Sequence, residues 1–559
     1  VIIMGITALI NKYTPTKKTE DLKEYFNISS DDEAALIVDN ELSDYKAKII
    51  DKKIYVDYKF VHDSLNSRFY WDANENVLLY TTASDIISAA ADSNSYSVTK
   101  QTNDFGYPIV KATSDSALIA LDYVKQYSNI TFKSYDDPAR IVITSKWDEI
   151  DSATVSKSTQ VRVKGGIKSP ILKEVKKDDK ITILDSGDKW DKVATEDGVI
   201  GYIKRKALSE SKKTKLTNPD YEEETFTHIK KDKDICLAWN QVTSQSANSK
   251  VPQIISSTKG INVMSPTWFY LNDNNGNLAD IASKDYVSYC HSQGIEVWGL
   301  FSNFENTDVD AAYVLTHTST RTTLINQIMS AAFNYELDGV NIDFENITEA
   351  AYGDSYIEFI RELAIKCHNN GISLSVDVTV PASFNKFFNR SDMANFADYI
   401  VIMGYDEHYK GSDAGSVSSI PWVTEGVEST LKEVPADQII LGMPFYTRIW
   451  ELTPKEDDDA VTDTEDQSKY TVASQVYSMD AAAAQLATNN ATTALDEESG
   501  QNYAEWSASN KLYKVWLEDS TSLEKRLKLV DDNKLAGAAF WKLGFENSSV
   551  WDTVIKYLN

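Results

Sequence analysis

The chain has 559 residues, of which 42% are hydrophobic and 11% aromatic, and its mean hydropathy is -0.36. This composition can fill several hydrophobic cores, and it excludes a polytopic membrane protein and a wholly disordered chain. Acidic residues outnumber basic ones by 84 to 56, for a formal charge of -28, which disfavours nucleic acids and anionic membranes as partners because phosphate groups are bound by clustered Lys and Arg.

The first 13 residues are interpreted as the remnant of a signal peptide or of a membrane anchor. The run VIIMGITALI is apolar but too short to span a bilayer, and a polar segment with lysines follows it. The alternative is a first buried strand. We expect an extracellular or cell-envelope protein, with attachment to the membrane through the N-terminus as one form of that location.

Residues 14–150 are predicted to form an α+β domain with an internal repeat. Each copy is typical of a short helix, a strand, a turn and a second strand. Four positions of the first copy have a matching residue 63 positions later. Phe60, Val61, Asn66 and Phe69 correspond to Tyr123, Val124, Asn129 and Phe132, respectively. The segment 52–82 resembles the copper amine oxidase N-terminal-like domain of bacterial envelope proteins. That resemblance implies a stalk or wall-contacting module, not a copper site, because His62 is the one histidine of the segment.

Residues 151–211 are predicted to form a small all-β barrel, because short alternating strands are separated by Gly and Asp turns. The segments VRV, GDKW and GVIGYI resemble the bacterial Src-homology-3-type domain. The resemblance implies binding of cell-wall peptides or glycan, and the alternative is a spacer without a ligand. The polar stretch 212–225 is predicted to be a linker.

Residues 226–559 are predicted to form a (β/α)8 TIM barrel, so the fold class is α/β. Amphipathic stretches such as 321–336 and 355–371 alternate with apolar runs of the kind that parallel strands buried on both faces have. An insertion is expected at about 450–530, between the last two strands. The eight runs are 234–239, 261–271, 295–301, 337–345, 372–380, 398–405, 438–446 and 535–543.

The fourth strand carries the strongest chemical signal. Its two-residue period places Asn341, Asp343 and Glu345 on one face, towards the barrel lumen. Acids on an interior face are costly unless they share protons or hydrogen bonds. A structural ion pair is the alternative, but among the eight strand runs Lys542 is the single basic residue. Closely spaced carboxyl groups push their pKa values apart, which leaves one of them protonated as a general acid.

Four segments resemble glycoside hydrolase family 18. DGVNIDFE (338–345) is similar to the signature on the fourth strand of that family. The segments of the sixth, seventh and eighth strands agree with it, namely MGYD (403–406), GMPFYTR (442–448) and AFWKLG (539–544). The form NIDFE is similar to the spore-germination and peptidoglycan-cleaving branch of the family.

The resemblance implies a retaining, substrate-assisted hydrolysis. It makes Glu345 the acid and base, Asp343 the residue that orients the acetamido N–H, and Tyr405 the donor to the acetamido carbonyl. It also implies a set of substrate-binding residues, with the indole of the last one beneath the sugar: Asn341, Met403, Asp406, Tyr446 and Trp541.

One residue departs from the family signature. The second acid of the signature is Asn341 here, and in the family that position hydrogen-bonds the next acid and modulates its protonation. An amide can donate a hydrogen bond but cannot hold a shared proton. We therefore expect an altered pH optimum and not a loss of activity.

Other sequence features indicate less. The three cysteines have no metal-ligand spacing and are predicted to be buried apolar residues, and we expect no metal and no cofactor. The acidic run 455–466 is interpreted as a solvated loop, because its spacing fits no EF-hand. Five tryptophans are candidates for sugar subsites or for the core: Trp239, Trp268, Trp298, Trp422 and Trp450. A last segment is expected near the cleft, with Trp516 and Asp519.

Three functions are consistent with these features. The first is a cell-envelope β-N-acetylglucosaminidase that acts on peptidoglycan, which the predicted wall-type domains favour. The second is a chitinase or chito-oligosaccharide hydrolase. The third is a carbohydrate-binding protein without activity, which the presence of Glu345 disfavours. The expected partners are a polysaccharide that contains N-acetylglucosamine and, through the N-terminal domains, the cell wall. We expect no nucleic-acid partner, and we expect the protein to be a monomer.

Overall fold

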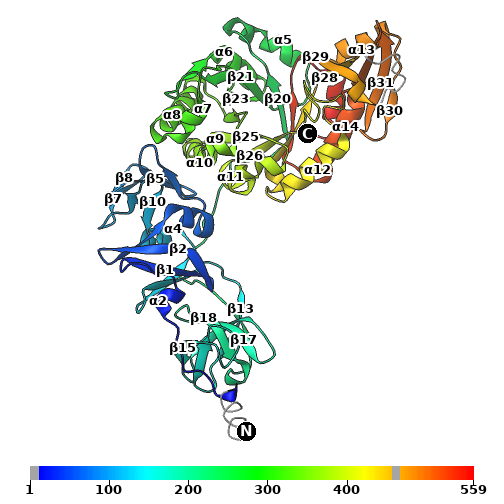
Figure 1. The fold of residues 1–559 in the computed structure, drawn as a ribbon. Helices are drawn as coiled ribbons and strands as arrows, with labels where there is room; N and C mark the ends of the chain where they lie inside the picture. The colour runs from blue at the N-terminus through cyan, green and yellow to red at the C-terminus, as the bar shows by residue number, and fades with distance from the viewer. Residues whose placement is uncertain (1–11, 456–465, 559) are drawn as a thin grey trace. The chain divides into compact units, whose positions relative to one another are not determined.

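The computed structural model describes residues 12–455 and 466–558 (Figure 1). The predicted signal or anchor remnant, apart from its last two residues, and nearly all of the acidic run lie outside the described residues. The chain divides into two compact units, one up to residue 82 and from 86 to 224, the other comprising 83–85 and 225–559.

Within the described part of the chain, no helix is both long and apolar enough to cross a membrane.

The first unit begins with an α+β region built on two sheets. A seven-stranded sheet has the order β11-β12-β1-β2-β3-β10-β9, and a five-stranded sheet has the order β4-β5-β6-β7-β8. The elements are α2 Leu22–Tyr25, β1 Glu33–Val38, β2 Glu41–Ile50, β3 Lys53–Asp57, α3 Tyr58–Phe60, η1 Val61–Leu65, β4 Tyr70–Asp72, β5 Val77–Thr81, β6 Ile86–Ala90, β7 Ser95–Val98, β8 Gln101–Asp104, β9 Val110–Ala112, β10 Ala117–Ala120, α4 Leu121–Tyr127, β11 Thr131–Tyr135 and β12 Arg140–Thr144.

The strand register of this region confirms the predicted repeat. Strands β4 and β5 pair Tyr70 with Leu79, and β11 and β12 pair Lys133 with Val142, so both partners advance by the same spacing. The pairs β2–β3 and β9–β10 are related in the same way. The two copies meet where β3 and β10 pair antiparallel. The resemblance to the copper amine oxidase N-terminal-like domain stays a prediction.

The rest of the first unit is a seven-stranded antiparallel sheet in the order β15-β14-β18-β17-β16-β13-β19. Its strands are β13 Glu149–Thr154, β14 Thr159–Arg162, β15 Ile171–Val175, β16 Lys180–Asp185, β17 Trp190–Thr195, β18 Ile200–Lys204 and β19 Lys212–Lys215, with the short helix η2 Arg205–Ala207. The predicted linker is wrong at its start, because residues 212–215 form β19 and pair with β13. The likeness to a Src-homology-3-type domain stays a prediction.

The two regions of the first unit share a hydrophobic core. Ala35 and Ile37 of β1 pack in one cluster with Val161 and Val193 of the antiparallel sheet. Ala34 and Leu36, on the opposite face of β1, belong to the core of the α+β region. Strand β1 is therefore covered on both faces, and the boundary predicted at residue 150 does not separate two independent cores.

The second unit contains the predicted barrel. Eight parallel strands run in the order β20-β33-β27-β26-β25-β24-β23-β21, and pairing of β20 with β21 closes the ring. The short strand β22 (Leu278–Asp280) extends β21 antiparallel. All eight predicted strands are confirmed, as β20 Ile235–Asn240, β21 Val263–Leu271, β23 Glu296–Ser302, β24 Gly339–Asp343, β25 Ser373–Thr379, β26 Tyr399–Met403, β27 Ile439–Pro444 and β33 Gly537–Trp541.

Helices surround the barrel (Figure 1), and the two predicted from amphipathic stretches correspond to α8 and α10. The α-helices are α5 Val251–Ser256, α6 Lys284–Ser292, α7 Ala311–Thr316, α8 Thr318–Tyr335, α9 Glu349–Tyr352, α10 Ser355–His368, α11 Arg390–Phe396, α12 Ile420–Leu431, α14 Ser520–Asp532 and α15 Val550–Val554. Short 3₁₀ turns occur at η3 Gln245–Lys250, η4 Ser383–Phe388 and η5 Ala436–Gln438.

The predicted insertion is a five-stranded antiparallel sheet in the order β29-β28-β32-β31-β30 (orange in Figure 1). Its elements are β28 Thr447–Pro454, η6 Gln467–Lys469, β29 Tyr470–Tyr477, α13 Met479–Thr488, β30 Ala494–Asp496, β31 Gln501–Ala508 and β32 Lys511–Trp516. The predicted end at about 530 is too late, because α14 contacts β27 and β33 and so belongs to the helices around the barrel.

The barrel lumen is filled in layers, as expected for this fold. At the bottom, Trp298 stacks on Tyr399 with ring centroids 5.5 Å apart. Gly339 makes room for this indole, because a Cβ atom at that position would lie 2.5 Å from it. The next layer contains Trp239 and Asn341. The acidic residues therefore lie above a packed floor, at the carboxyl ends of the strands.

The shared core of the first unit predicts the effect of Gly198→Ala. Gly198 has φ +85°, and an added Cβ atom would lie 2.9 Å from Val142 and 3.1 Å from Ile37. Backbone strain and overpacking should together lower the free energy of unfolding of this unit by about 1–3 kcal/mol. Calorimetry of the full chain would measure the shift, with Gly166→Ala as control, since an added Cβ atom there meets nothing within 4 Å. Equal stability of the two variants would contradict the shared core.

Candidate active site

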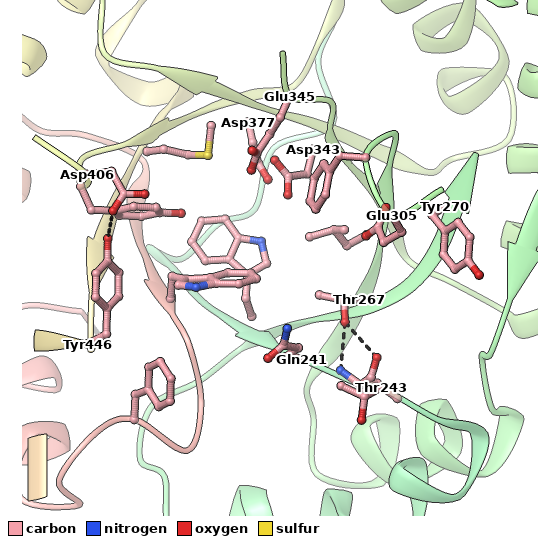
Figure 2. A pocket seen from close by; sticks show the side chains of 18 of the residues that line it. Gln241, Thr243, Thr267, Tyr270, Glu305, Asp343, Glu345, Asp377, Asp406 and Tyr446 are labelled. Carbon is pink, nitrogen blue, oxygen red and sulfur yellow. Dashed lines mark hydrogen bonds between the residues drawn. The ribbon is translucent and has the colours of Figure 1, made fainter. Parts of the chain in front are cut away.

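A cavity of about 620 Å³ lies at the carboxyl ends of the barrel strands. Figure 2 shows its acidic side chains gathered from several strands. Arg448 and Val476 of the inserted sheet complete one wall. Seven of the eight predicted site residues line the cavity: Asp343, Glu345, Met403, Tyr405, Asp406, Tyr446 and Trp541.

Asp343 is the last residue of β24 and is 6% exposed. Its Oδ1 atom is buried and has no hydrogen-bond partner among the described residues. Burial raises the pKa of Asp343 to about 8, and the nearby charges of Glu345 and Glu305 add to the shift. A carboxyl in this state can change its protonation in the neutral range, where an ordinary aspartate is fully ionised.

Glu345 stands two residues further on, where the chain leaves the strand and its side chain can reach the open cavity. The cavity wall desolvates its carboxyl, which raises its pKa, and the charges of Asp406 and Glu305 raise it further. Asn303, which follows β23, fixes its backbone with two hydrogen bonds. The Asn303 amide donates to the Glu345 carbonyl at 2.9 Å and accepts from the Glu345 N–H at 2.8 Å. The acid is thus held in place by a neighbouring strand end.

Tyr405, Asp406 and Tyr446 form a connected group on another side of the cavity (Figure 2). The Tyr446 hydroxyl donates to Asp406, and the rings of Tyr405 and Tyr446 meet edge to face with centroids 6.2 Å apart. Burial raises the pKa of Tyr405 well above its usual range, and the carboxylates Asp377 and Asp343 add to this. Tyr405 therefore keeps its hydroxyl proton and can donate it to a ligand.

The apolar part of the cavity is formed by two indoles. Trp541 and Trp239 meet edge to face with ring centroids 5.9 Å apart, and both line the cavity. A flat aromatic surface of this kind can pack against the face of a pyranose ring. Met403 adds a flexible apolar side chain from β26.

Asn341 is the one predicted site residue that does not line the cavity. It is fully buried one step below Asp343. Its Oδ1 atom accepts hydrogen bonds from the Trp239 indole at 2.9 Å and the Ser265 hydroxyl at 3.2 Å. Its Nδ2 atom donates to Ser375 at 3.0 Å and to Asp377 at 2.7 Å. An amide has two donors and two acceptor positions, so Asn341 has no hydrogen bond left for Asp343.

Asp377, Asn303 and Glu305 are among the polar residues of the cavity region that were not predicted from the sequence. Asp377 of β25 is 3% exposed and lines the cavity. The period-two rule applied to the fourth strand would have identified it, because Ser373, Ser375 and Asp377 alternate in the same way. Asn303 and Glu305 directly follow the third strand, at the end where barrel enzymes carry their chemistry. Glu305 accepts a hydrogen bond from Ser302 at 2.6 Å.

Other predicted candidates lie away from the cavity. Of the five tryptophans, Trp239 alone lines it. Trp268 donates to Asn248 and Trp450 to Gly415, and both indoles are buried. Trp516 packs in the inserted sheet, and Asp519 caps helix α14. These residues stabilise the fold.

No set of three or more His, Cys, Asp or Glu side chains in residues 12–455 and 466–558 has the arrangement of a metal site. The three cysteines, Cys236, Cys290 and Cys367, are free and buried, as predicted. What the cavity offers chemically is a group of carboxyls with raised pKa values, a protonated phenol and two indoles.

Comparison with known proteins identifies the domain that carries this cavity. Residues 302–546 match the family model described as Glycosyl hydrolases family 18. An uncharacterized glycosylase of Bacillus subtilis, YvbX, is 24% identical over 301 residues, which cover 51% of this chain and 81% of the relative. The cortical fragment-lytic enzyme of the same organism is 24% identical over 287 residues, which cover 50% of this chain and 63% of the relative.

Solved structures share the barrel fold. The spore cortex-lytic enzyme SleL of Bacillus cereus aligns with a TM-score of 0.51 at 18% identity and covers 61% of this chain and 76% of its own. A chitinase of Chromobacterium violaceum aligns with a TM-score of 0.50 at 20% identity, and the alignment covers 58% of this chain and 98% of the chitinase. The family match and the glycosylase relatives show that the chain carries a glycosidase domain.

The raised pKa of Asp343 predicts a pH-dependent cost to stability. Between the ordinary value of 3.8 and about 8, the folded chain holds a proton on this carboxyl that the unfolded chain has released. Unfolding then releases a proton, so stability falls as pH rises through this window. Asp343→Asn removes the cost, and we expect it to stabilise the barrel by about 2–4 kcal/mol more at about pH 9 than at about pH 4.

Calorimetric unfolding of the barrel across this pH range would measure the difference between wild type and variant. Ser265→Ala, which changes the same lumen without removing a carboxyl, is the matched control. A constant difference between Asp343→Asn and wild type at all pH values would contradict the raised pKa.

Proposed function

The chain contains a glycoside hydrolase family 18 domain, and from this premise we propose that it cleaves β-1,4 bonds next to N-acetylglucosamine in bacterial cell-wall peptidoglycan. The proposed reaction retains the anomeric configuration and uses the substrate's own acetamido group. The observation that carries the proposal is a buried Asp343 close to Glu345, whose side chain is open to the cavity, both with raised pKa values, in a cavity that Tyr405 also lines.

In the proposed first step, protonated Glu345 donates its proton to the glycosidic oxygen. The acetamido carbonyl oxygen attacks C1 as the bond from C1 to the glycosidic oxygen breaks, and an oxazolinium ion forms. Asp343 accepts a hydrogen bond from the acetamido N–H and balances the positive charge. The Tyr405 hydroxyl donates to the acetamido carbonyl and holds it below C1. A raised pKa of Glu345 supports this step, because the acid must be protonated near neutral pH.

In the second step, ionised Glu345 takes a proton from a water molecule as the water oxygen bonds to C1. The C1 bond to the acetamido oxygen breaks, and the acetamido group is restored. One carboxyl thus serves as acid and then as base. The indoles of Trp541 and Trp239 supply an apolar surface beneath the reacting sugar.

The choice of peptidoglycan rests on relatives and on the predicted N-terminal domains. Three of the relatives are cortical fragment-lytic enzymes by name, from Bacillus subtilis, Bacillus anthracis and Bacillus cereus. The proposed wall-binding role of residues 14–211 would bring the barrel to the same polymer in the cell envelope. Chitin is the second candidate substrate, because a Caenorhabditis elegans relative is named an endochitinase and is 27% identical over 158 residues.

Digestion of purified peptidoglycan and of chitin would test the substrate. The products are reduced with borohydride, and the reduced ends are identified by mass spectrometry. We expect reduced N-acetylglucosamine ends from peptidoglycan and a rate lowered by about 10³-fold in Glu345→Gln, which keeps the shape of the acid but cannot give up a proton. Ends that carry N-acetylmuramic acid, or cleavage of chitin alone, would contradict the proposal.

The stereochemistry of the product is a separate prediction. Proton NMR of the fresh digest should show the β-anomer of the new reducing end first, with the α-anomer appearing later by mutarotation. Retention follows from two displacements at C1, the first by the acetamido oxygen and the second by water. Initial release of the α-anomer would indicate direct attack by water and would overturn the substrate-assisted reaction.

A further inference from the structure

The second buried acid of the cavity, Asp377, has no part in the reaction proposed above. It lies near the end of β25, and Ser373 and Ser375 precede it on the same face of that strand. Figure 2 shows its carboxyl beside those of Glu345 and Asp343. A carboxyl buried to this extent is costly unless it is protonated or paired, so its presence requires an explanation.

The hydrogen bonds around Asn341 fix how Asp377 is held. The Asn341 carbonyl oxygen accepts from Trp239 and Ser265, which turns its NH₂ group towards β25. That NH₂ group donates to Asp377 Oδ1 at 2.7 Å. One oxygen of Asp377 is therefore an acceptor, and the other is the oxygen that can carry a proton.

The neighbours of Asp377 are acids and phenols. Asp343 and Glu345 face it from the end of β24, and their charges add to the burial that raises its pKa well above the ordinary range. Tyr356 of α10 and Tyr405, which follows β26, face the same carboxyls. Burial raises the pKa values of both phenols well above their usual range, so they stay protonated.

Cations are scarce here. Of the described residues that line the cavity, five are acidic and one, Arg448, is basic. Arg448 donates to Ser474 of the inserted sheet at 3.0 Å. Two buried carboxyls without a cation cannot both be ionised at low cost, so one of them keeps a proton.

We propose that Asp377 is a positioning residue that shares one proton with Asp343 and holds it while Asp343 binds the substrate as a carboxylate. The inference rests on the proposed function. When the acetamido N–H donates to Asp343, the negative charge is stabilised there. The O–H bond of Asp343 breaks, the proton forms an O–H bond with Asp377, and no charge leaves the pair. The Oδ1 atom of Asp343 has no hydrogen-bond partner among the described residues, so it can accept from that O–H group.

Two variants separate this role from a structural one. Asp377→Leu keeps the approximate volume but removes the donor, and we expect kcat on peptidoglycan to fall by about 100-fold with KM within about threefold. The acid limb of its pH profile should move up by about one unit, because nothing then stabilises ionised Asp343. Asp377→Asn presents an amide N–H where the carboxyl O–H was, so it should recover at least about tenfold of the lost rate.

The matched control is Ser375→Ala, which removes another hydrogen-bond partner of Asn341 but no titrating group. It should keep the wild-type pH profile. Equal losses in Asp377→Leu and Asp377→Asn with unchanged pH profiles would overturn the proposal, and so would a wild-type profile in Asp377→Leu.

Infrared spectroscopy tests the shared proton without a substrate. At neutral pH the wild type should show the C=O band of a protonated carboxyl that is hydrogen-bonded to a second carboxyl, and Asp377→Asn should shift this band, because Asp343 alone then holds the proton. A band that persists unchanged in Asp377→Asn would overturn the inference. If the wild type cleaves neither polymer but the band is shifted in Asp377→Asn, then the proposed function fails and the shared proton stands.

Discussion

The carboxyls of Asp343 and Asp377 are enclosed in the upper barrel lumen, and the remaining architecture of the cavity follows from keeping them there. The free energy of moving an ionised carboxylate out of water amounts to several kcal/mol, and the basic residue of the wall, Arg448, is engaged with the inserted sheet. The raised pKa values of Asp343 and Asp377 reduce this cost, because a protonated carboxyl carries no charge. The Asn341 amide also donates a hydrogen bond to Asp377. Acids that cannot ionise freely are suited to proton transfer near neutral pH.

The packed lumen below makes this arrangement rigid. The Trp298 ring occupies the space beside Gly339, and Trp239 stands above it with its N–H bound to Asn341. Asn341 therefore connects a hydrophobic floor to the acidic layer through fixed hydrogen bonds. Glu345 is held independently by the paired hydrogen bonds from Asn303. The substrate therefore binds to acidic groups whose positions are already fixed in the folded chain.

The barrel strands and the position of the two acids on the fourth strand could be predicted from the order of the residues. The hydrogen bonds inside the lumen could not, because they depend on how neighbouring strands pair. Alternation along one strand was enough to place Asp343 and Glu345 at the top of the lumen, and the apolar runs were enough to predict eight strands. The hydrogen bonds of Asn341 could not be predicted, because their partners come from three other strands whose register is set only when the barrel closes. The pairing of Asn341 with Ser375 across β24 and β25 puts Asp377 one step higher, beside Asp343.

The boundary predicted at residue 150 of the first unit also failed because packing between distant segments cannot be predicted from the sequence. The continuous apolar run of β1 is typical of a strand covered on both faces, but the sequence does not indicate which element packs on the second face. Only the fold showed that Ala35 and Ile37 pack on the antiparallel sheet. A boundary drawn from a change in strand pattern therefore divided a region with one common core.

The amide at position 341 and the acid at position 377 depend on each other. Asn341 donates to Ser375 and Asp377 and accepts from Trp239 and Ser265. A carboxylate at 341 could accept the latter two hydrogen bonds but would face Asp377 with an oxygen at hydrogen-bond distance, which two ionised acids do not tolerate. The departure of this chain from the family signature is thus matched to an acid on the neighbouring strand. The protonation of the cavity belongs to the pair of strands β24 and β25, and no single motif along the chain describes it.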